Sequence, residues 1–420
     1  MCIRDSVYGL NDAPFQWYQA FDEHARGTGW ERSQFDSCVY FLRDPKTHVL
    51  VGVLGAHVDD SLVAGHGPAF DKAVAALRAR FPYRKWRVGS GEFCGVLYHQ
   101  NPETFEITYS QKEYAQHLHP VNLSKERAAQ KDAPATAKEI ASLRGLNGAV
   151  NWLATQTRPD LAVQVSMSQQ SLPNPTVGDL LYANQMAHRA RQFQDVEIHV
   201  RSIPLDKLAI CMHSDAAFCN AKGDKTQAGF TLAFCDQGLL ANETATWSPF
   251  FWKSFRLHRV VPSTLGGEAQ AFSNASAIAE WMSLLVSEAR HGQFDLRECE
   301  ARLRATPMIG VTDCKSLYDN VTSLSSVASV QDKRVCVDIA IIKQCMERAG
   351  LQVRWCPTEL MICDALTKDK QDPADLLRAV LSLGRYQLSA EAEILKAKKT
   401  QRALLQRTRE ARAKKCPAPL

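Results

Sequence analysis

The chain has 420 residues, 45% of them hydrophobic and 23% charged, which allows two or three folded domains and argues against a disordered protein. No apolar run approaches the roughly 20 residues of a membrane helix, and the N-terminus has no signal-peptide pattern, so we expect a cytoplasmic or nuclear protein that is not secreted and has no membrane partner. The net charge of the whole chain is +5, but residues 396–415 alone hold nine Lys or Arg and one acid. The rest of the chain has 41 basic and 44 acidic residues, so it is not a broadly basic nucleic-acid binder.

The pattern along the chain predicts an α/β (α+β) protein of three blocks and a tail. Residues 7–120, the first block, alternate strand-like and helix-like segments. Residues 121–204, the helical block, begin with a polar linker and are otherwise mostly helical in pattern. Strand-like and helix-like segments alternate again in residues 205–372, the third block, and residues 373–420 form a basic helical tail.

Two adjacent acids, Asp59 and Asp60, interrupt the apolar pattern of the first block. They lie between the apolar run 49–56 and a second short run, 62–64, which predicts a hairpin with both carboxylates at its tip. Because successive side chains of a strand point to opposite faces, Asp59 is the expected metal ligand and Asp60 a supporting neighbour. The alternative is that both residues serve only the turn, for which Asp is well suited.

Four acidic residues of the third block stand at the ends of strand-like runs or at the starts of other segments. Asp215 and Asp313 each follow a strand-like apolar run. Glu268 opens a helix-like stretch, and Asp364 opens a segment after the last strand-like run. Carboxylates that converge from such positions suit two divalent cations, which prefer oxygen ligands and can stabilise both oxygens of a phosphoryl displacement. For any one of the four, the alternative is a solvated surface charge.

Two weaker candidates for nucleic-acid binding lie further along the chain. Lys315 and Ser316 follow Asp313 at an expected helix start, where free backbone N–H groups favour a phosphate. An ordinary helix cap is the alternative there. The tail spaces leucines among Lys and Arg, so a basic amphipathic helix could contact a phosphate backbone or simply be solvated.

Five short motifs of the third block follow one another in a characteristic order and spacing: His213–Ala217, Thr246–Ser248, Ser263–Ala271, Thr312–Leu317 and Asp364–Lys368. In these motifs the block resembles the ribonuclease H domain of copia-type LTR retrotransposon polyproteins. The resemblance implies a ribonuclease H-like mixed sheet flanked by helices in this part of the chain.

The same resemblance implies a role for each of the four acids. Asp215 would bridge two Mg²⁺ ions, with Mn²⁺ as the alternative metal. Glu268 and Asp313 would bind one of these ions, and Asp364 would bind the other. The implied partner and substrate is an RNA–DNA hybrid, and other segments of the polyprotein are further expected partners. No small-molecule cofactor is implied.

Motifs of the first block have matches in the same family: Val7–Pro14 with Trp17 and Tyr18, His57–Asp60, Gly91–Gly95 and Ser110–Tyr114. Here the chain resembles the palm and thumb of a copia-type reverse transcriptase, and residues 145–160 resemble the segment that joins polymerase to ribonuclease H. The polymerase core of that family begins upstream, with an earlier Asp that bridges both catalytic metals. The resemblance therefore implies a truncated, inactive polymerase region in which Asp59 and Asp60 are a vestigial metal site.

We therefore expect a ribonuclease H-type endonuclease that hydrolyses the RNA strand of RNA–DNA hybrids, within a fragment of a retrotransposon polyprotein. RNA-directed DNA polymerase activity is not expected from this fragment alone. The alternative is a non-catalytic retroelement remnant that at most binds nucleic acid through its tail.

Overall fold

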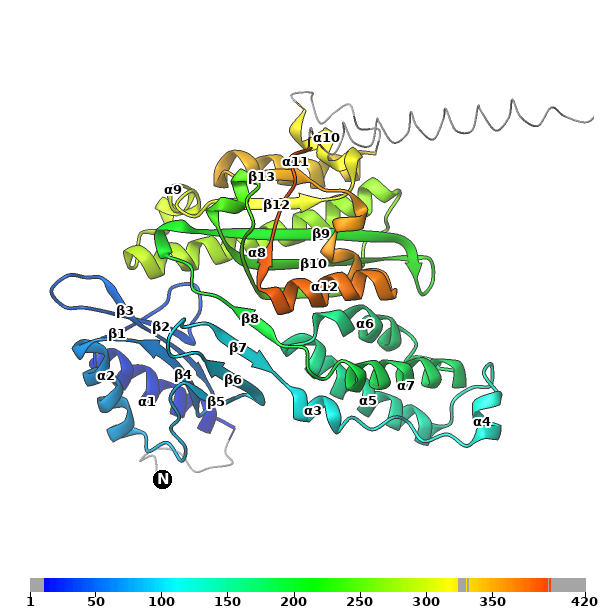
Figure 1. The fold of residues 1–420 in the computed structure, drawn as a ribbon, viewed down its shortest axis with the longest axis horizontal. Helices are drawn as coiled ribbons and strands as arrows, with labels where there is room; N and C mark the ends of the chain where they lie inside the picture. Colours follow the sequence, from blue (N-terminus) through cyan, green and yellow to red (C-terminus); the bar gives the residue numbers. More distant parts are fainter. Residues whose placement is uncertain (1–10, 324–329, 331, 392, 394–420) are drawn as a thin grey trace, which may run out of the picture.

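The computed structural model describes residues 11–323, 330, 332–391 and 393, and the statements below concern these residues. Residues 7–10 of the first block and the basic segment 394–420 lie outside them. Three sheets hold the described part of the chain together, with helices packed against them (Figure 1). None of the helices in these ranges is long and apolar enough to span a lipid bilayer.

The N-terminal sheet has four antiparallel strands in sequential order, β1 to β4. The helices α1 and α2 share one core with it, in which Phe21, Tyr40, Leu54 and Leu77 are buried. The expected hairpin is confirmed, because β3 and β4 pair up to the tip, where His57 lies opposite Asp60. The elements are α1 (Ala13–Gly27), β1 (Trp30–Arg32), β2 (Val39–Arg43), β3 (Leu50–His57), β4 (Asp60–Gly65) and α2 (Pro68–Arg80).

The small sheet, β5 to β8, joins two parts of the chain that we expected to be separate. Its first three strands come from the first block, but β8 comes from the far end of the helical block. The strand β8 pairs with the edge strand β7 and satisfies backbone groups that would otherwise be exposed. The expected boundary at residue 120 therefore does not separate two independent units. The strands are β5 (Ser90–Phe93), β6 (Val96–Gln100), β7 (Ile107–Ser110) and β8 (Ile198–Val200).

The helical block packs its helices around a core of small and aliphatic side chains. Capping boxes begin its two longest helices: Thr136 and Glu139 cap one, and Thr176 and Asp179 cap the other. Such reciprocal caps satisfy backbone N–H groups that the first helical turn leaves unpaired. Its helices are α4 (Lys125–Ala129), α5 (Ala137–Gln156), η1 (Pro159–Leu161), α6 (Ala162–Gln170) and α7 (Val177–Gln192), and α3 (Lys112–Gln116), at the end of the first block, packs with them.

The large sheet of the third block is mixed, in the order β13-β12-β9-β10-β11-β14. The strands β9, β10 and β11 are antiparallel neighbours, whereas β12 is parallel to β9 and β13 is parallel to β12. The strands of this sheet are β9 (Leu208–Ala221), β10 (Lys225–Asp236), β11 (Ala245–Arg256), β12 (Met308–Thr312), β13 (Gln352–Trp355) and β14 (Arg385–Tyr386).

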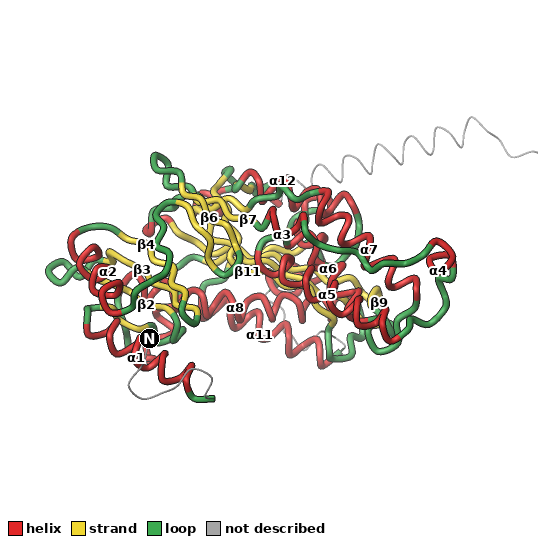
Figure 2. Tube along the Cα trace, turned by 90° about the horizontal axis from the view of Figure 1, so that it is seen from below, coloured by secondary structure: helices red, strands yellow, loops and turns green. Residues whose placement is uncertain are grey.

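Helices cover both faces of the large sheet. Side chains alternate between the two faces along each strand, and apolar side chains on both faces need to be buried. In β9, Ile210 and Met212 pack with α8, α10 and α11, which lie on one face, while Ala209 and Cys211 pack with η7 and α12 on the other. Figure 2 shows α8 and α11 side by side along the sheet. The predicted fold class, a mixed sheet flanked by helices, is confirmed. The helices are η2 (Leu205–Lys207), η3 (Gln237–Ala241), α8 (Thr264–His291), η4 (Leu296–Glu298), α9 (Cys299–Leu303), α10 (Lys315–Thr322), α11 (Lys333–Ala349), η6 (Thr358–Leu360), η7 (Ile362–Leu366) and α12 (Gln371–Leu383).

The expected boundary between the third block and the tail, at residue 372, falls inside α12. This helix buries Leu377 and Leu381 in the core of the large sheet, so its pattern belongs to a core helix and not to the tail. The chain then returns as β14, which pairs with β11, and Glu391 forms an ion pair with Arg354 of β13. The folded unit thus extends to about the end of the described residues.

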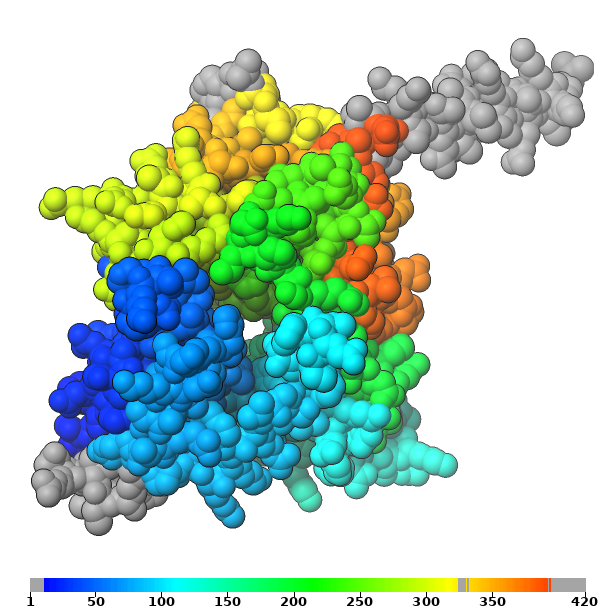
Figure 3. All heavy atoms as spheres, turned by 60° about the vertical axis from the view of Figure 1, so that its left-hand side comes forward, coloured from blue at the N-terminus to red at the C-terminus, as the bar shows by residue number. Residues whose placement is uncertain are grey.

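The first block and the helical block lie side by side beneath the third block, with a hollow between them (Figure 3). The N-terminal sheet contacts the third block through Glu288 of α8, which is buried. Its carboxylate accepts hydrogen bonds from the Ser33 hydroxyl at 2.5 Å and the Gln34 backbone N–H at 2.8 Å. The guanidinium of Arg43 donates to the Glu288 backbone oxygen at 2.7 Å.

Candidate metal centre

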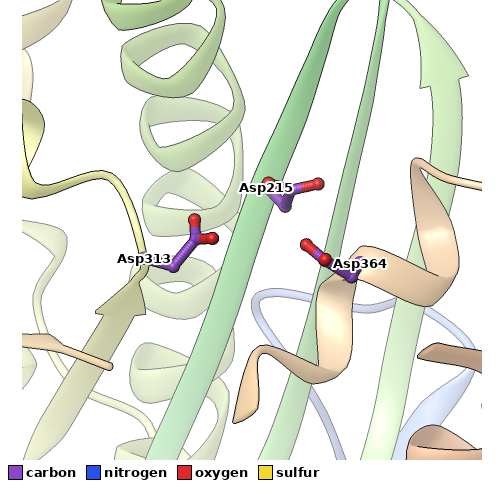
Figure 4. A group of neighbouring side chains, drawn as sticks. All are labelled: Asp215, Asp313 and Asp364. Atoms are coloured by element: carbon purple, nitrogen blue, oxygen red, sulfur yellow. The ribbon is translucent and has the colours of Figure 1, made fainter. Parts of the chain in front are cut away.

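Three of the four predicted acids of the third block converge at one end of the large sheet. Each of Asp215, Asp313 and Asp364 offers a carboxylate oxygen, and these oxygens all lie within 4.8 Å of one another. Asp215 lies within β9, Asp313 directly follows the parallel strand β12, and Asp364 lies in η7 (Figure 4). The strand β12 pairs in parallel with β9, with Val311 opposite His213, so Asp313 just beyond the end of β12 comes beside Asp215. Asp215 does not end its strand as the apolar run suggested, because β9 continues to Ala221, and η7 carries the third acid across the face of the sheet.

The three carboxylates share a poorly hydrated site. Asp215 is 2% exposed and Asp364 is 6% exposed. Burial, together with the charge of Asp215, raises the pKa of Asp364 to about 7 and also raises that of Asp313. Like charges held together away from water oppose ionisation, and a bound cation would relieve that opposition.

The fourth predicted acid, Glu268, lies beside this group without joining the set of three. It comes from the first turns of α8 and is 3% exposed. Burial raises the pKa of Glu268 well above its usual range, and the charges of Asp215 and Asp313 add to the effect. Its carboxylate accepts a hydrogen bond from the Ala216 backbone, but its Oε2 atom has no hydrogen-bond partner within the described residues. An unpaired buried carboxylate oxygen is costly and suits a cation.

Two residues that follow Asp364, neither of them predicted as a site residue, also reach the centre. The Thr367 hydroxyl donates a hydrogen bond to Asp215 Oδ2. Lys368 Nζ lies 2.6 Å from Asp364 Oδ1 and 3.6 Å from Asp215 Oδ2. The available signal was their spacing, since residues three and four positions after Asp364 return to the same side of a helical turn.

The segment that carries Thr367 and Lys368 is held by the rest of the protein. The next residue, Asp369, accepts hydrogen bonds at 2.8 Å from Tyr182 and Arg189, both on α7. The Asn220 side chain of β9 donates to the Thr367 backbone oxygen at 2.8 Å. The helical block therefore positions one side of the acidic centre.

A buried ion network fixes the helical block to α12 below the centre. Asp160 is fully buried, and its carboxylate accepts from Arg158 at 2.8 Å and from Arg378 of α12 at 3.0 Å. Burial alone would raise the pKa of Asp160, but the two guanidinium groups outweigh it and the pKa is lowered. Asp160 therefore stays ionised and links η1 to the third block.

His213, two residues before Asp215, is excluded from acid–base work by its surroundings. It is fully buried, and its ring lies against the rings of Trp247 and Tyr386. Burial lowers the pKa of His213 to about 3, so the ring is neutral near pH 7. It serves as part of the core beneath the centre.

The other predicted site residues lie apart from this centre. Asp59 and Asp60 are exposed at the tip of the β3–β4 hairpin, and no third metal-ligating side chain joins them in the part of the chain that the structure describes. Lys315 pairs with Asp319 on the same helix, and its ammonium lies over the ring of Tyr318. The Ser316 hydroxyl lies 3.2 Å from Cys314 Sγ. These contacts fit an ordinary helix start, and a role in phosphate binding stays a prediction.

Curated relatives of the chain are retrotransposon polyproteins, although no protein-family model matches it. The chain is 22% identical over 378 residues to the Retrovirus-related Pol polyprotein from transposon RE1 of Arabidopsis thaliana, which covers 87% of this chain and 24% of the relative. It is 23% identical over 190 residues to that from transposon TNT 1-94 of Nicotiana tabacum, covering 41% of this chain and 14% of the relative. The chain thus spans about a quarter of the first of these relatives. The resemblance to copia-type polyproteins is confirmed at low identity.

Two solved structures are also similar in part. The crystal structure of RNase H1 from the halophilic archaeon Halobacterium salinarum NRC-1 is 11% identical, with a TM-score of 0.26, and covers 38% of this chain and 96% of that one. The foamy viral protease-reverse transcriptase in complex with RNA/DNA hybrid is 11% identical, with a TM-score of 0.39, and covers 73% of this chain and 36% of that one.

Proposed function

We propose that the third block is a ribonuclease H-type nuclease domain of a retrotransposon polyprotein and hydrolyses the RNA strand of RNA–DNA hybrids. The observation that carries this proposal is the convergence of Asp215, Asp313 and Asp364 within 4.8 Å. The homology to Pol polyproteins over 87% of the chain supports the same reading. The nucleic-acid partner and other segments of the polyprotein are proposed on that homology alone.

The residues present fit a divalent metal ion. Their donors are carboxylate oxygens, the ligands that Mg²⁺ and Mn²⁺ prefer, and Glu268 Oε2 is buried without a partner. We assign Asp215, Asp313 and Glu268 to one ion, and Asp215 with Asp364 to a second. Bound there, such ions would activate a water molecule and stabilise the departing 3′ oxygen.

The chain's own residues prepare the centre for this chemistry. Asp215 is central, and the Thr367 hydroxyl fixes one of its oxygens. Glu268 is oriented by the Ala216 backbone, which leaves the other oxygen free to bind. The buried surroundings reduce the competition of bulk water with these charged groups and strengthen their interaction with a cation.

We propose a different status for the first block, as the palm and thumb part of a reverse transcriptase without polymerase activity in this chain. Asp59 and Asp60 are solvated at a hairpin tip, where two adjacent carboxylates alone do not enclose a metal. Residues 121–204 would be the connecting segment. In this assignment the ribonuclease H domain runs from residue 205 through α12 and β14, to about residue 391.

Single-turnover cleavage of a labelled RNA–DNA hybrid by the full chain, with Mg²⁺ titrated, tests the proposal. The amide variants Asp215→Asn, Glu268→Gln, Asp313→Asn and Asp364→Asn keep the side-chain shape but remove a charge. Each is expected to lose roughly 100-fold or more of the rate, and double variants little more, because the four residues act as a unit. Asp215→Asn is expected to be the most severe.

Asp224→Asn is the matched control, because Asp224 is an exposed acid beside β10 and its left-handed backbone (φ +55°) suits Asn as well as Asp. It should cleave at the wild-type rate. Full activity in Asp313→Asn would contradict the assignment. Absence of cleavage by the unaltered chain would favour a non-catalytic remnant instead.

A further inference from the structure

The acidic centre contains a cation of its own, the ammonium group of Lys368. Its Nζ atom lies 2.6 Å from Asp364 Oδ1 and 3.6 Å from Asp215 Oδ2. The side chain is 27% exposed, so the ion pair with two buried acids is partly shielded from water. Within the described residues, Lys368 is the cationic side chain that forms ion pairs with these acids.

The charge balance of the centre is therefore uneven. On the side of Asp215 and Asp364, Lys368 supplies a positive charge and a hydrogen bond. On the other side, Asp313 forms no ion pair in the described part of the chain and accepts a hydrogen bond from the Thr358 side chain, and Glu268 Oε2 has no hydrogen-bond partner there. A divalent ion would meet the unpartnered Glu268 oxygen on the second side, and the Lys368 ammonium group between two acids on the first.

The position of Lys368 is set by contacts beyond the centre. The Lys368 backbone N–H donates to the Asp364 backbone oxygen at 2.8 Å, which closes a helical turn. The neighbouring Asp369 is held at 2.8 Å by both Tyr182 and Arg189 of α7. The stem of Lys368 thus leaves the backbone at a defined place, and its ammonium is directed at the two acids.

We propose that Lys368 occupies the place between Asp215 and Asp364 that the second divalent ion would take, so that the two ions load in order. The first ion binds on the side of Asp313 and Glu268. The second ion binds only when it displaces the Lys368 ammonium, and it therefore binds more weakly. This inference rests on the proposed function, because it assumes that the acids hold divalent ions.

Lys368 is a positioning residue in this scheme, since it keeps Asp364 and Asp215 together while the second ion is absent. Displacing a partly shielded ion pair is expected to weaken the second ion's affinity by about tenfold relative to a site without the lysine. Removal of the ammonium should accordingly tighten that site. A purely structural ion pair would behave differently, because its loss would loosen the centre and weaken metal binding.

Calorimetric titration of the full chain with Mn²⁺ alone, in the absence of nucleic acid, tests the proposal. The wild-type chain is expected to bind one ion tightly and a second one more weakly. Lys368→Met keeps the length and the apolar stem but removes the charge, and it should tighten the second step about tenfold while leaving the first unchanged. Lys368→Arg keeps the cation and should retain two separate steps.

Two results would overturn the inference: equal affinity for both ions in the wild-type chain, or weaker binding of either ion in Lys368→Met. The wild-type measurement decides even if Lys368→Met fails to fold, which circular dichroism would reveal. The failure of the proposed function looks different, because the wild-type chain would then bind no Mn²⁺ and cleave no hybrid. Cleavage together with two equal binding steps would remove the role of Lys368 alone.

Discussion

The N-terminal sheet and the large sheet each carry aspartates that follow strand-like apolar runs in the sequence: Asp59 and Asp60 in the first, and Asp215, Asp313 and Asp364 in the second. The first two are exposed at a hairpin tip. In the second group, the oxygens of three carboxylates lie within 4.8 Å of one another, and two of the three residues are buried. The comparison shows that the residue type does not make a metal centre. Packing of distant segments around the strands does.

The physical difference lies in what surrounds each strand. The tip of the β3–β4 hairpin is a tight turn, with Val58 in the left-handed region at φ +54°, and the residues on both sides of it are exposed. The strand β9 lies inside a six-stranded sheet, with α8 on one face and η7 on the other. In this second setting, burial raises the pKa of Asp364 and of Asp313.

The largest expected effect comes from breaking the network that holds the helical block beneath the large sheet. Asp160→Asn should destabilise the chain by about 3–5 kcal/mol, because it leaves the buried Arg158 and Arg378 without a full countercharge. Urea unfolding measures the change. Asp59→Asn is the matched exposed control and should stay within about 0.5 kcal/mol of the wild type. A similar small change in Asp160→Asn would show that the network adds little.

Divalent metal should stabilise the large-sheet centre and not the hairpin tip. A ligand that binds only the folded state adds about 2.7 kcal/mol at a hundred times its dissociation constant, so Mn²⁺ should raise the melting temperature. Asp215→Asn is expected to lose most of this shift, and Asp60→Asn to keep it. Thermal melts of the three chains with and without Mn²⁺ provide the measurement. An equal rise in melting temperature in the wild type, Asp215→Asn and Asp60→Asn would show that Mn²⁺ binds elsewhere.

A smaller effect should appear in the pH dependence of the metal-free chain. The folded-state pKa of Asp364 is raised from 3.8 to about 7, so the folded protein retains a proton there that the unfolded chain releases at lower pH. The contribution of Asp364 to stability should therefore fall as the pH rises from about 4 to about 7. Urea unfolding with a chelator across this range should show the fall. The unfolding free energy of Asp364→Asn should depend less steeply on pH. An equally steep decline in that variant would mean that other groups cause the pH dependence.

The smallest expected effect concerns the exposed pair. We expect no primer extension by this chain on an RNA or DNA template with Mg²⁺ or Mn²⁺, because Asp59 and Asp60 are solvated and no third ligand joins them in the described residues. Hybrid cleavage should be the same in Asp59→Asn as in the wild type. Template-dependent nucleotide addition that disappears in Asp59→Asn would contradict the view that Asp59 and Asp60 do not form a working metal site.

Much of the local structure could be predicted from the sequence because local patterns report it. Alternating and apolar runs indicated the strands β3, β9 and β12, and the acids after the first and last of them marked a turn and a strand end, whereas β9 continues past Asp215 to Ala221. The polar-to-apolar pattern at Thr136 and Thr176 carries capping boxes that start helices without help from distant residues. The motif spacing also pointed to the retrotransposon polyproteins that are the chain's relatives.

Other features depended on contacts between residues far apart in the chain, and local patterns hold no information about such contacts. The pairing of β8 with β7 crosses the boundary expected at residue 120, and the pairing of β14 with β11 extends the folded unit past the boundary expected at residue 372. The place of Lys368 between two acids depends on α7, because Tyr182 and Arg189 of that helix donate hydrogen bonds to Asp369, which is 187 and 180 positions later in the chain.

The sequence by itself determined which acids follow strand-like apolar runs or lie near a helix start, and from their motifs the family of the chain's relatives. Only the tertiary structure decided that Asp215, Asp313 and Asp364 meet, that Glu268 lies beside them with an unpaired oxygen, and that Asp59 and Asp60 are left in solvent. The physical reason is that periodicity reports which face of a strand or helix is apolar, whereas burial and charge proximity arise only when the sheet order brings separate strands together.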